Sequence, residues 1–200
     1  MPEALAPVQS AFVVSFSLAT FSPASAEDVA GVEPDLQRKW RRRGHLPASE
    51  GDGHARFNCF DLAHLLALRL LSERGSGPLL AREPATGCAA AIAFHALSWP
   101  NAWEGADLAR VPGRTWGDKS QLLRAALFGA AGIEPVPARY FAWWTSGPFS
   151  FEASLDAAFN DGVSSDERFA GVVHTLDLEA VASSFVGRAG RPFVHVETVE

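Results

Sequence analysis

Apolar and polar residues in the first part of the chain form blocks that predict short helices separated by clear breaks. Ser22, followed by a proline, is typical of a helix start, and Gly31 ends the helix opened there. Pro34 can begin a second helix, and Gly44 lies where a left-handed residue commonly ends one. The sequence therefore predicts helices over residues 23–30 and from residue 34 to the residue before Gly44.

A polar, turn-forming segment at residues 47–55 follows the second helix. Residues 56–60 then predict a short strand, which would complete a hairpin with the stretch before the turn. Asp61 is placed to cap a third helix that Gly75 closes. Leucines surround most of this helix, so we expect it to be clamped between the N-terminal and C-terminal parts, to lie at a dimer contact, or to fill an ordinary domain core. They are Leu62, Leu65, Leu66, Leu68, Leu70 and Leu71.

The remainder of the chain alternates between helical and strand patterns. Apolar blocks predict helices at residues 88–99 and 119–131, and residues 139–144 predict a strand. Near the C-terminus, segments 172–175 and 193–196 have strand character and flank a helix with one apolar face, and we expect the two strands to pair in parallel. The apolar residues of that helix are Leu178, Val181, Ala182 and Phe185.

The composition is that of a globular protein. The 200 residues are 48% apolar and 20% charged, which excludes a disordered chain. No apolar run approaches the ~20 residues that cross a bilayer, so we expect no membrane partner. Residues 11–26 look like an export signal, but the segment before them lacks Lys and Arg and carries Glu3. We therefore expect a cytoplasmic protein.

Positive charge is concentrated in one segment of an acidic chain. The net charge is -6, yet residues 36–56 contain six basic and two acidic residues, a local charge of +4. On a helical wheel Leu36 and Trp40 share a stripe that we expect to be buried. The cations predicted opposite that stripe are Arg38, Arg41 and Arg42, and those predicted at its edges are Lys39 and Arg43.

A basic helix face is most often simply solvated. Here, however, residues 38–43 hold five cations and no acid, whereas a solvated helix normally intersperses the two signs. A helix fits the DNA major groove, and arginine can pair with guanine edges or phosphate oxygens. The turn at 47–55 would hold Arg56 beside the same surface. The pattern thus predicts a contact with double-stranded DNA.

Several motifs of residues 21–75 follow one another in a particular order and spacing. An aromatic residue opens the first helix, a Gly-Val-x-Pro turn follows it, and the basic helix contains an aromatic residue. An Arg-aromatic pair, a further aromatic residue and an Asp follow the turn at 47–55. The residues concerned are Phe21, Gly31, Val32, Pro34, Arg38, Trp40, Arg42, Arg43, Gly44, Leu46, Arg56, Phe57, Phe60 and Asp61. In these motifs the segment resembles the winged helix-turn-helix of MerR-type transcription regulators.

The resemblance implies that Arg38 and its neighbours Lys39, Arg41, Arg42 and Arg43 contact DNA, with Arg56 on the backbone from the wing. It also implies a homodimer. The chain departs from the family because no long heptad helix is predicted after Gly75, and because the metal-binding cysteines of metal-sensing members have no counterpart. The usual mode of dimerisation is therefore not expected.

The predicted organisation is an α+β protein in three parts. Residues 1–20 form an N-terminal arm or strand, residues 21–75 a winged helix-turn-helix, and residues 76–200 a C-terminal α/β module for regulation or dimerisation. That module ends in the strand-helix-strand unit. It is acidic and could receive a small-molecule or protein effector. Its tryptophans would line an effector pocket or protein contact, or fill a core; they are Trp99, Trp103, Trp116, Trp143 and Trp144.

The cysteines and histidines form no pattern that predicts a metal site or a catalytic site. The spacing of His45, His54, Cys59 and His64 matches no zinc pattern, and Cys59 has no recognisable partners for nucleophilic catalysis. His174 and His195, expected side by side in the terminal strands, have no evident carboxylate partner. We predict no catalytic residue, metal or cofactor. Two alternatives remain: a protein-interaction or accessory module with a degenerate winged helix, and a small enzyme on the strand-helix-strand unit.

Overall fold

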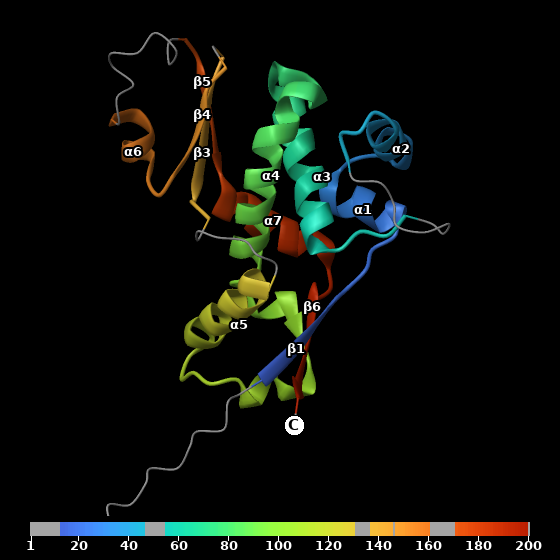
Figure 1. The fold of residues 1–200 in the computed structure, drawn as a ribbon, viewed down its shortest axis with the longest axis vertical. Coiled ribbons are helices and arrows are strands. Elements are labelled where there is room, and N and C mark those ends of the chain that lie inside the picture. Colours follow the sequence, from blue (N-terminus) through green and yellow to red (C-terminus); the bar gives the residue numbers. More distant parts are fainter. Residues whose placement is uncertain (1–12, 47–54, 131–136, 146, 161–170, 200) are drawn as a thin grey trace, which may run out of the picture.

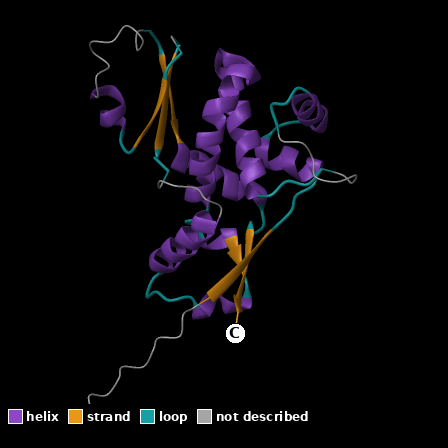
Figure 2. Cartoon of the chain, viewed as in Figure 1, coloured by secondary structure: helices purple, strands orange, loops and turns teal. Residues whose placement is uncertain are grey.

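In the computed structural model the chain is an α+β protein. The structure describes residues 13–46, 55–130, 137–145, 147–160 and 171–199. Figure 2 shows helices at the centre and two small sheets at separate edges of the molecule. In the described part of the chain, no helix has the length and apolar character needed to cross a membrane.

The two N-terminal helices form where the sequence predicts them. Helix α1 spans Pro23–Ala30, and the hydroxyl of Ser22 accepts a hydrogen bond from the backbone N–H of Ser25 at 3.1 Å. Gly31 ends α1 with a left-handed φ of 69°. Helix α2 spans Pro34–Arg42, so its last residue lies two positions before Gly44. Helix starts of this kind are local signals, which explains their agreement with the prediction.

The region after the turn differs from the predicted hairpin. The turn's residues 47–54 lie outside the described residues. In place of a strand at 56–60, Phe57 forms an isolated antiparallel bridge with Phe21, with backbone N–O distances of 2.8 and 3.0 Å. The partner is therefore the chain before α1, and His45 and Leu46 before the turn form no strand.

Helix α3 spans Cys59–Leu71 and begins earlier than predicted. Asn58 is the N-cap in place of Asp61, which instead accepts a hydrogen bond from the backbone N–H of Asn58 at 2.9 Å. This reciprocal arrangement is a capping box. The side chain of Asn58 accepts hydrogen bonds from the first backbone N–H groups of the helix, and the side chain of Asp61 accepts one from the N–H of Asn58. Helix α3 packs between α1 and α4, and most of its leucines are buried, as predicted.

A long helix follows Gly75, where the sequence predicts no long heptad helix and a helix only from residue 88. After a π-helical turn, η1 at Ser72–Ser76, helix α4 runs over Gly77–Ala96. It therefore begins eleven residues before the predicted start at residue 88. Its small residues, such as Ala85, Cys88 and Ala89, are buried and allow close packing on α3 (Figure 1). Because α3 covers it, α4 is part of the core rather than a free coiled-coil strand.

Both ends of the described chain belong to one sheet. Strand β1, Val13–Leu18, pairs antiparallel with β6, Val194–Val199, and β6 pairs in parallel with the short β2, Trp103–Glu104. The predicted N-terminal arm is thus a strand over these residues. Between β2 and the second sheet lie the 3-10 helix η3, Ala106–Arg110, and helix α5, Trp116–Ala130, while the 3-10 helix η2, Pro100–Ala102, precedes β2.

The second sheet is antiparallel, in the order β4-β3-β5. Its strands are β3, Tyr140–Trp144, β4, Phe149–Glu152, and β5, Val173–Asp177, and the short helix α6, Leu155–Asn160, follows β4.

Strand β5, helix α7 (Leu178–Ala189) and β6 form the predicted succession, but the predicted parallel pairing is wrong. Strands β5 and β6 lie in different sheets, so His174 and His195 are not neighbours. A connection long enough for a crossover permits parallel pairing but does not impose it, because the partner of a strand depends on how the whole chain packs. Here Asp177 is both the last residue of β5 and the N-cap of α7, so α7 carries the chain away toward the other sheet.

One hydrophobic core joins the N-terminal helices to the C-terminal segment. The rings of Phe185 and Phe193 stack with centroids 4.8 Å apart, and Phe21 lies 5.8 Å from Phe193. Trp40, Phe57 and the leucines of α3 belong to the same cluster. Of the middle tryptophans, Trp103 and Trp144 are buried, while Trp99 is 43% exposed. The core is thus continuous across the predicted boundary at residues 75–76, and the division into domains stays a prediction.

Candidate nucleic-acid interface

Helix α2 is held in place by a buried polar side chain. The Nε2 atom of Gln37 donates hydrogen bonds to the carbonyl oxygens of Val32, at 2.7 Å, and Pro23, at 3.0 Å. Gln37 is only 1% exposed. These bonds satisfy carbonyls at the start of α1 and in the turn, so the amide fixes the angle between the two helices. In Figure 1, α2 stands at the margin of the molecule beside α1.

The buried edge of α2 is Gln37 with Trp40, not Leu36 with Trp40. Leu36 is 38% exposed, whereas Trp40 is 6% exposed and belongs to the core. The prediction of a buried Leu36 was therefore wrong, and that of a buried Trp40 is confirmed. The helical wheel assigned burial by hydrophobicity. The amide nitrogen of Gln37 can nevertheless be buried, because the two carbonyl oxygens replace the hydrogen bonds that it would make to water.

This rotation changes which cations face solvent. Arg38, Lys39, Arg42 and Arg43 are exposed, and Arg43 is the C-cap of α2. Arg41, predicted to point outward, is half-buried with its guanidinium carbon 5.2 Å from the centre of the Phe57 ring. Three exposed cations therefore lie in α2 and a fourth at its C-cap, and of the three predicted to point outward only Arg38 and Arg42 are exposed.

One of these four cations has an acidic neighbour. Arg38 forms an ion pair with Asp35, one turn earlier in α2, and both side chains are mostly exposed. Exposed pairs of this kind contribute only about 0–1 kcal/mol, so a phosphate can replace the carboxylate. In the described ranges, Lys39, Arg42 and Arg43 form no ion pair with a carboxylate. Their charge is thus available to an anion.

Arg56 lies next to the bridge between Phe57 and Phe21, and its side chain is exposed. The sequence predicts Arg56 in a wing hairpin, but the described residues on either side of the turn form no hairpin strands. The bridge nevertheless brings Arg56 beside the chain that leads into α1. Arg41, which covers the Phe57 ring, is close to the same bridge.

The structure adds a cation that the sequence analysis missed. The guanidinium carbon of Arg191 lies 4.0 Å from the centre of the Phe21 ring, and Arg191 also donates to the carbonyl oxygen of Thr20. Arg191 follows α7, near the other end of the chain, so no local pattern could have placed it here. The guanidinium groups of Arg41 and Arg191 thus cover the two rings of the Phe21–Phe57 bridge, and Arg56 directly precedes Phe57 in the chain.

The cysteines and histidines show no catalytic or metal-binding arrangement. Burial raises the pKa of Cys59 to about 12 and raises that of Cys88 as well, so both remain thiols. Burial lowers the pKa of His64, whose Nε2 has no hydrogen-bond partner among the described residues. His195 lies 3.4 Å from Glu197 and 3.8 Å from Glu104, carboxylates that the sequence analysis missed. Within the described ranges, no three potential ligands could hold a metal ion.

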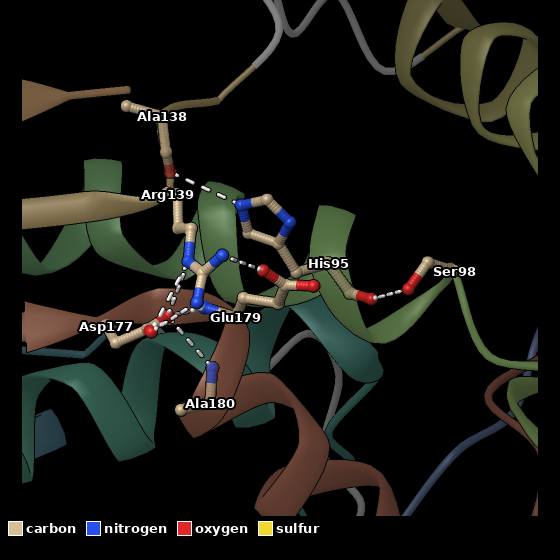
Figure 3. A network of polar contacts seen from close by, with 7 residues as sticks. All are labelled: His95, Ser98, Ala138, Arg139, Asp177, Glu179 and Ala180. Carbon is tan, nitrogen blue, oxygen red and sulfur yellow. Dashed lines mark hydrogen bonds and ion pairs between the residues drawn. The ribbon is translucent and has the colours of Figure 1, made fainter. Parts of the chain in front are cut away.

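A second polar cluster joins the β4-β3-β5 sheet to α7 and α4 (Figure 3). Arg139 bonds Asp177 at 2.8 Å and Glu179 at 3.0 Å. Burial opposes the ionisation of Asp177, but the bonds from Arg139 and from the N–H of Ala180 outweigh it and lower the pKa of that carboxyl. His95 donates from Nε2 to the carbonyl oxygen of Ala138 at 3.3 Å. The charged side chains of this cluster are paired with one another, and the pairs connect the start of β3 to the start of α7.

In comparisons with known proteins, no family model, no curated protein and no solved structure matches this chain.

Proposed function

We propose that this protein is a sequence-specific DNA-binding transcription regulator in which α2 is the recognition helix. The observation that carries this proposal is the group of exposed cations on α2, anchored from behind by Trp40 and Gln37. A rigid helix with arginines on its outer face can enter the major groove and bond guanine edges. The rest of the chain is acidic, so DNA would be bound on this surface only.

The interface we propose consists of α2 and the residues around the Phe21–Phe57 bridge. In the proposed complex the cations of α2 read bases or bind phosphates, and Arg56 and Arg191 bind the adjacent backbone. The N-terminal part would act as a MerR-like winged helix-turn-helix in which the bridge takes the place of a longer hairpin. The interface cations are Arg38, Lys39, Arg42, Arg43, Arg56 and Arg191.

We further propose that the protein acts in the cytoplasm as a homodimer. Two copies of α2 would then meet half-sites about one helical turn apart on double-stranded DNA. Since α4 packs on α3, the dimer contact would lie elsewhere than in a free coiled-coil helix.

A protein-interaction or accessory module is the second candidate. The ion pair of Arg38 with Asp35 favours it, because it lowers the net charge that α2 presents to an anion. Such a module would show no salt-sensitive retention of DNA. The two candidates therefore differ in one measurable property.

The experiment is selection of genomic DNA fragments bound by the full chain at moderate salt, followed by affinity measurements against salt. Five or six phosphate contacts give a slope of log affinity against log salt of about -5. Enrichment of a common sequence with this slope would support the proposal. Recovery of no enriched sequence, or a slope near zero, would contradict it and favour the interaction module.

A further inference from the structure

A cavity of about 470 Å³ lies between the bend after α3 and the β4-β3-β5 sheet. A smaller one of about 180 Å³ adjoins it and shares Arg74, Trp143 and His174 with it. In Figure 1 the upper part of α4 and this sheet stand next to each other. The larger volume is within the range of about 300–1,000 Å³ that small-molecule sites occupy.

The sheet side of the cavity is an aromatic row. Trp143 of β3 is directly opposite Phe149 of β4 and opposite His174 of β5, so the three side chains share one sheet face. All three line the cavity. Trp143 is half-buried, and its indole N–H has no hydrogen-bond partner in the described part of the chain. The row therefore offers a flat apolar surface with a donor.

A second row holds this surface at a fixed distance from α4. Phe141 of β3 pairs with Phe151 of β4, their ring centroids 5.1 Å apart. The Phe151 ring touches α4 at Gly87, where a Cβ would lie 2.5 Å from it. Only glycine allows this approach. The cavity is thus bounded by packed side chains on its inner side.

The wall of the cavity formed by η1 and α4 carries two charged side chains, Arg74 and Glu83. Arg74 lies in η1, which departs from helical geometry at Gly75 with a φ of 102°. Leu80 and Glu83 of α4 complete this wall, and Leu80 is 68% exposed. Among the described residues Arg74 forms no hydrogen bond or ion pair. Within the part of the chain that the structure describes, a guanidinium without a partner therefore stands at the rim of an aromatic cavity.

We propose that this cavity binds a flat aromatic molecule with a single carboxylate. The ring would lie between Trp143 and Leu80, and the carboxylate would accept hydrogen bonds from Arg74, whose planar fork matches two carboxylate oxygens. Glu83 on the same wall disfavours a second negative charge on the ligand. This site is independent of the basic surface of α2, so it stands whether or not the protein binds DNA.

The test is titration calorimetry of the full chain with 2-naphthoate and with its neutral analogue 2-naphthylmethanol. We expect saturable binding of naphthoate and about 10- to 100-fold weaker binding of the alcohol, the difference that a charge-assisted hydrogen bond makes. Arg74→Ala should weaken naphthoate binding by a similar factor and leave the alcohol unchanged. Arg82→Ala, which removes an exposed cation of α4 outside the cavity, is the matched control and should change neither.

Two further variants sharpen the assignment. Glu83→Gln should strengthen naphthoate binding, because it removes the carboxylate that opposes the anion. Trp143→Phe should keep a ring in the row but weaken binding by the loss of the indole N–H. Circular dichroism and the midpoint of thermal unfolding check that every variant is folded.

Three results would overturn the proposal. The first is no saturable binding of naphthoate in the millimolar range. The second is binding that Arg74→Ala does not weaken, which places the ligand elsewhere. The third is tighter binding of 2-naphthylmethylamine than of naphthoate, which would make Glu83 the recognition group and the ligand a cation.

Discussion

The guanidinium group of Arg191 lies over the ring of Phe21, 4.0 Å from its centre. This contact brings the segment after α7 to the base of the N-terminal helices. It also places a cation at the Phe21–Phe57 bridge, which Arg56 directly precedes in the chain. The proposed interface is therefore built from both ends of the sequence.

Removal of Arg191 tests whether the C-terminal segment takes part in DNA binding. Arg191→Ala should reduce the magnitude of the salt slope by about 1, the effect of one lost phosphate contact. It should also cost about 0.5–1 kcal/mol of stability through the lost cation–π contact. Arg114→Ala, which removes another exposed cation, is the control. An unchanged slope with intact DNA binding would exclude Arg191 from the interface.

Removal of Arg38 or Arg42 tests the outward orientation of the α2 cations. Arg42→Ala should weaken binding to the selected DNA by about 1–3 kcal/mol if the arginine bonds a guanine, with the unfolding midpoint unchanged. Arg38→Ala should behave alike, since its partner Asp35 is exposed. The measurements are fluorescence anisotropy with labelled DNA and calorimetric unfolding. A large loss of stability in either variant would mean that these side chains are structural.

Truncation of Trp40 and of Leu36 tests which residues anchor α2. Trp40→Ala should destabilise the protein by about 3–5 kcal/mol, the usual cost of deleting a buried aromatic ring. Leu36→Ala should cost much less, because Leu36 is 38% exposed. Denaturant unfolding of both variants gives the comparison. Equal losses of unfolding free energy in the two variants would show that Leu36 is buried with Trp40, as the helical wheel predicts.

Gln37 is a buried amide whose bonds can be removed at nearly constant volume. Gln37→Leu should lower the free energy of unfolding by about 1–3 kcal/mol, because the carbonyls of Pro23 and Val32 lose a donor. Its Oε1 has no partner among the described residues, so removal of this buried acceptor offsets part of the loss of the two donated bonds. Denaturant unfolding measures this loss, and a stabilised variant would show that these bonds contribute nothing net.

His64 predicts a pH dependence of stability. Burial lowers its pKa in the folded state, so the unfolded chain binds the proton first. The stability that neutral His64 supplies is therefore present above about pH 6.5, the unfolded pKa, and is lost as the pH falls. His64→Leu also removes the unpartnered Nε2, and should stabilise the protein by about 1–3 kcal/mol.

The gain from His64→Leu should grow as the pH is lowered from about 7.5 to about 5.5, because the leucine takes up no proton. Denaturant unfolding at the two pH values gives the comparison. A gain that is the same at both values would show that His64 keeps its ordinary pKa in the folded protein.

By itself, the sequence determined the bounds of α1, the start of α2 and the anchoring aromatic residue of α2. Ser22, Pro34 and Gly31 act through bonds and backbone angles of their own segment, so their effect is visible in a short window. Trp40 is larger than Leu36, and the helical wheel predicted its burial correctly, whereas the burial that the wheel predicted for Leu36 is not observed. The α+β class and the strand at 140–144 follow from the same kind of local pattern.

Only the tertiary structure decided which strands pair and which side chains from distant parts of the chain are in contact. The pairing of β1 with β6, the parting of β5 from β6 into different sheets, and the position of Arg191 over Phe21 join residues far apart in the chain. Periodicity reports the face of an element and not its partner, which depends on how all the faces pack together. Gln37 shows the same limit, because an amide is buried only where the fold supplies acceptors for it.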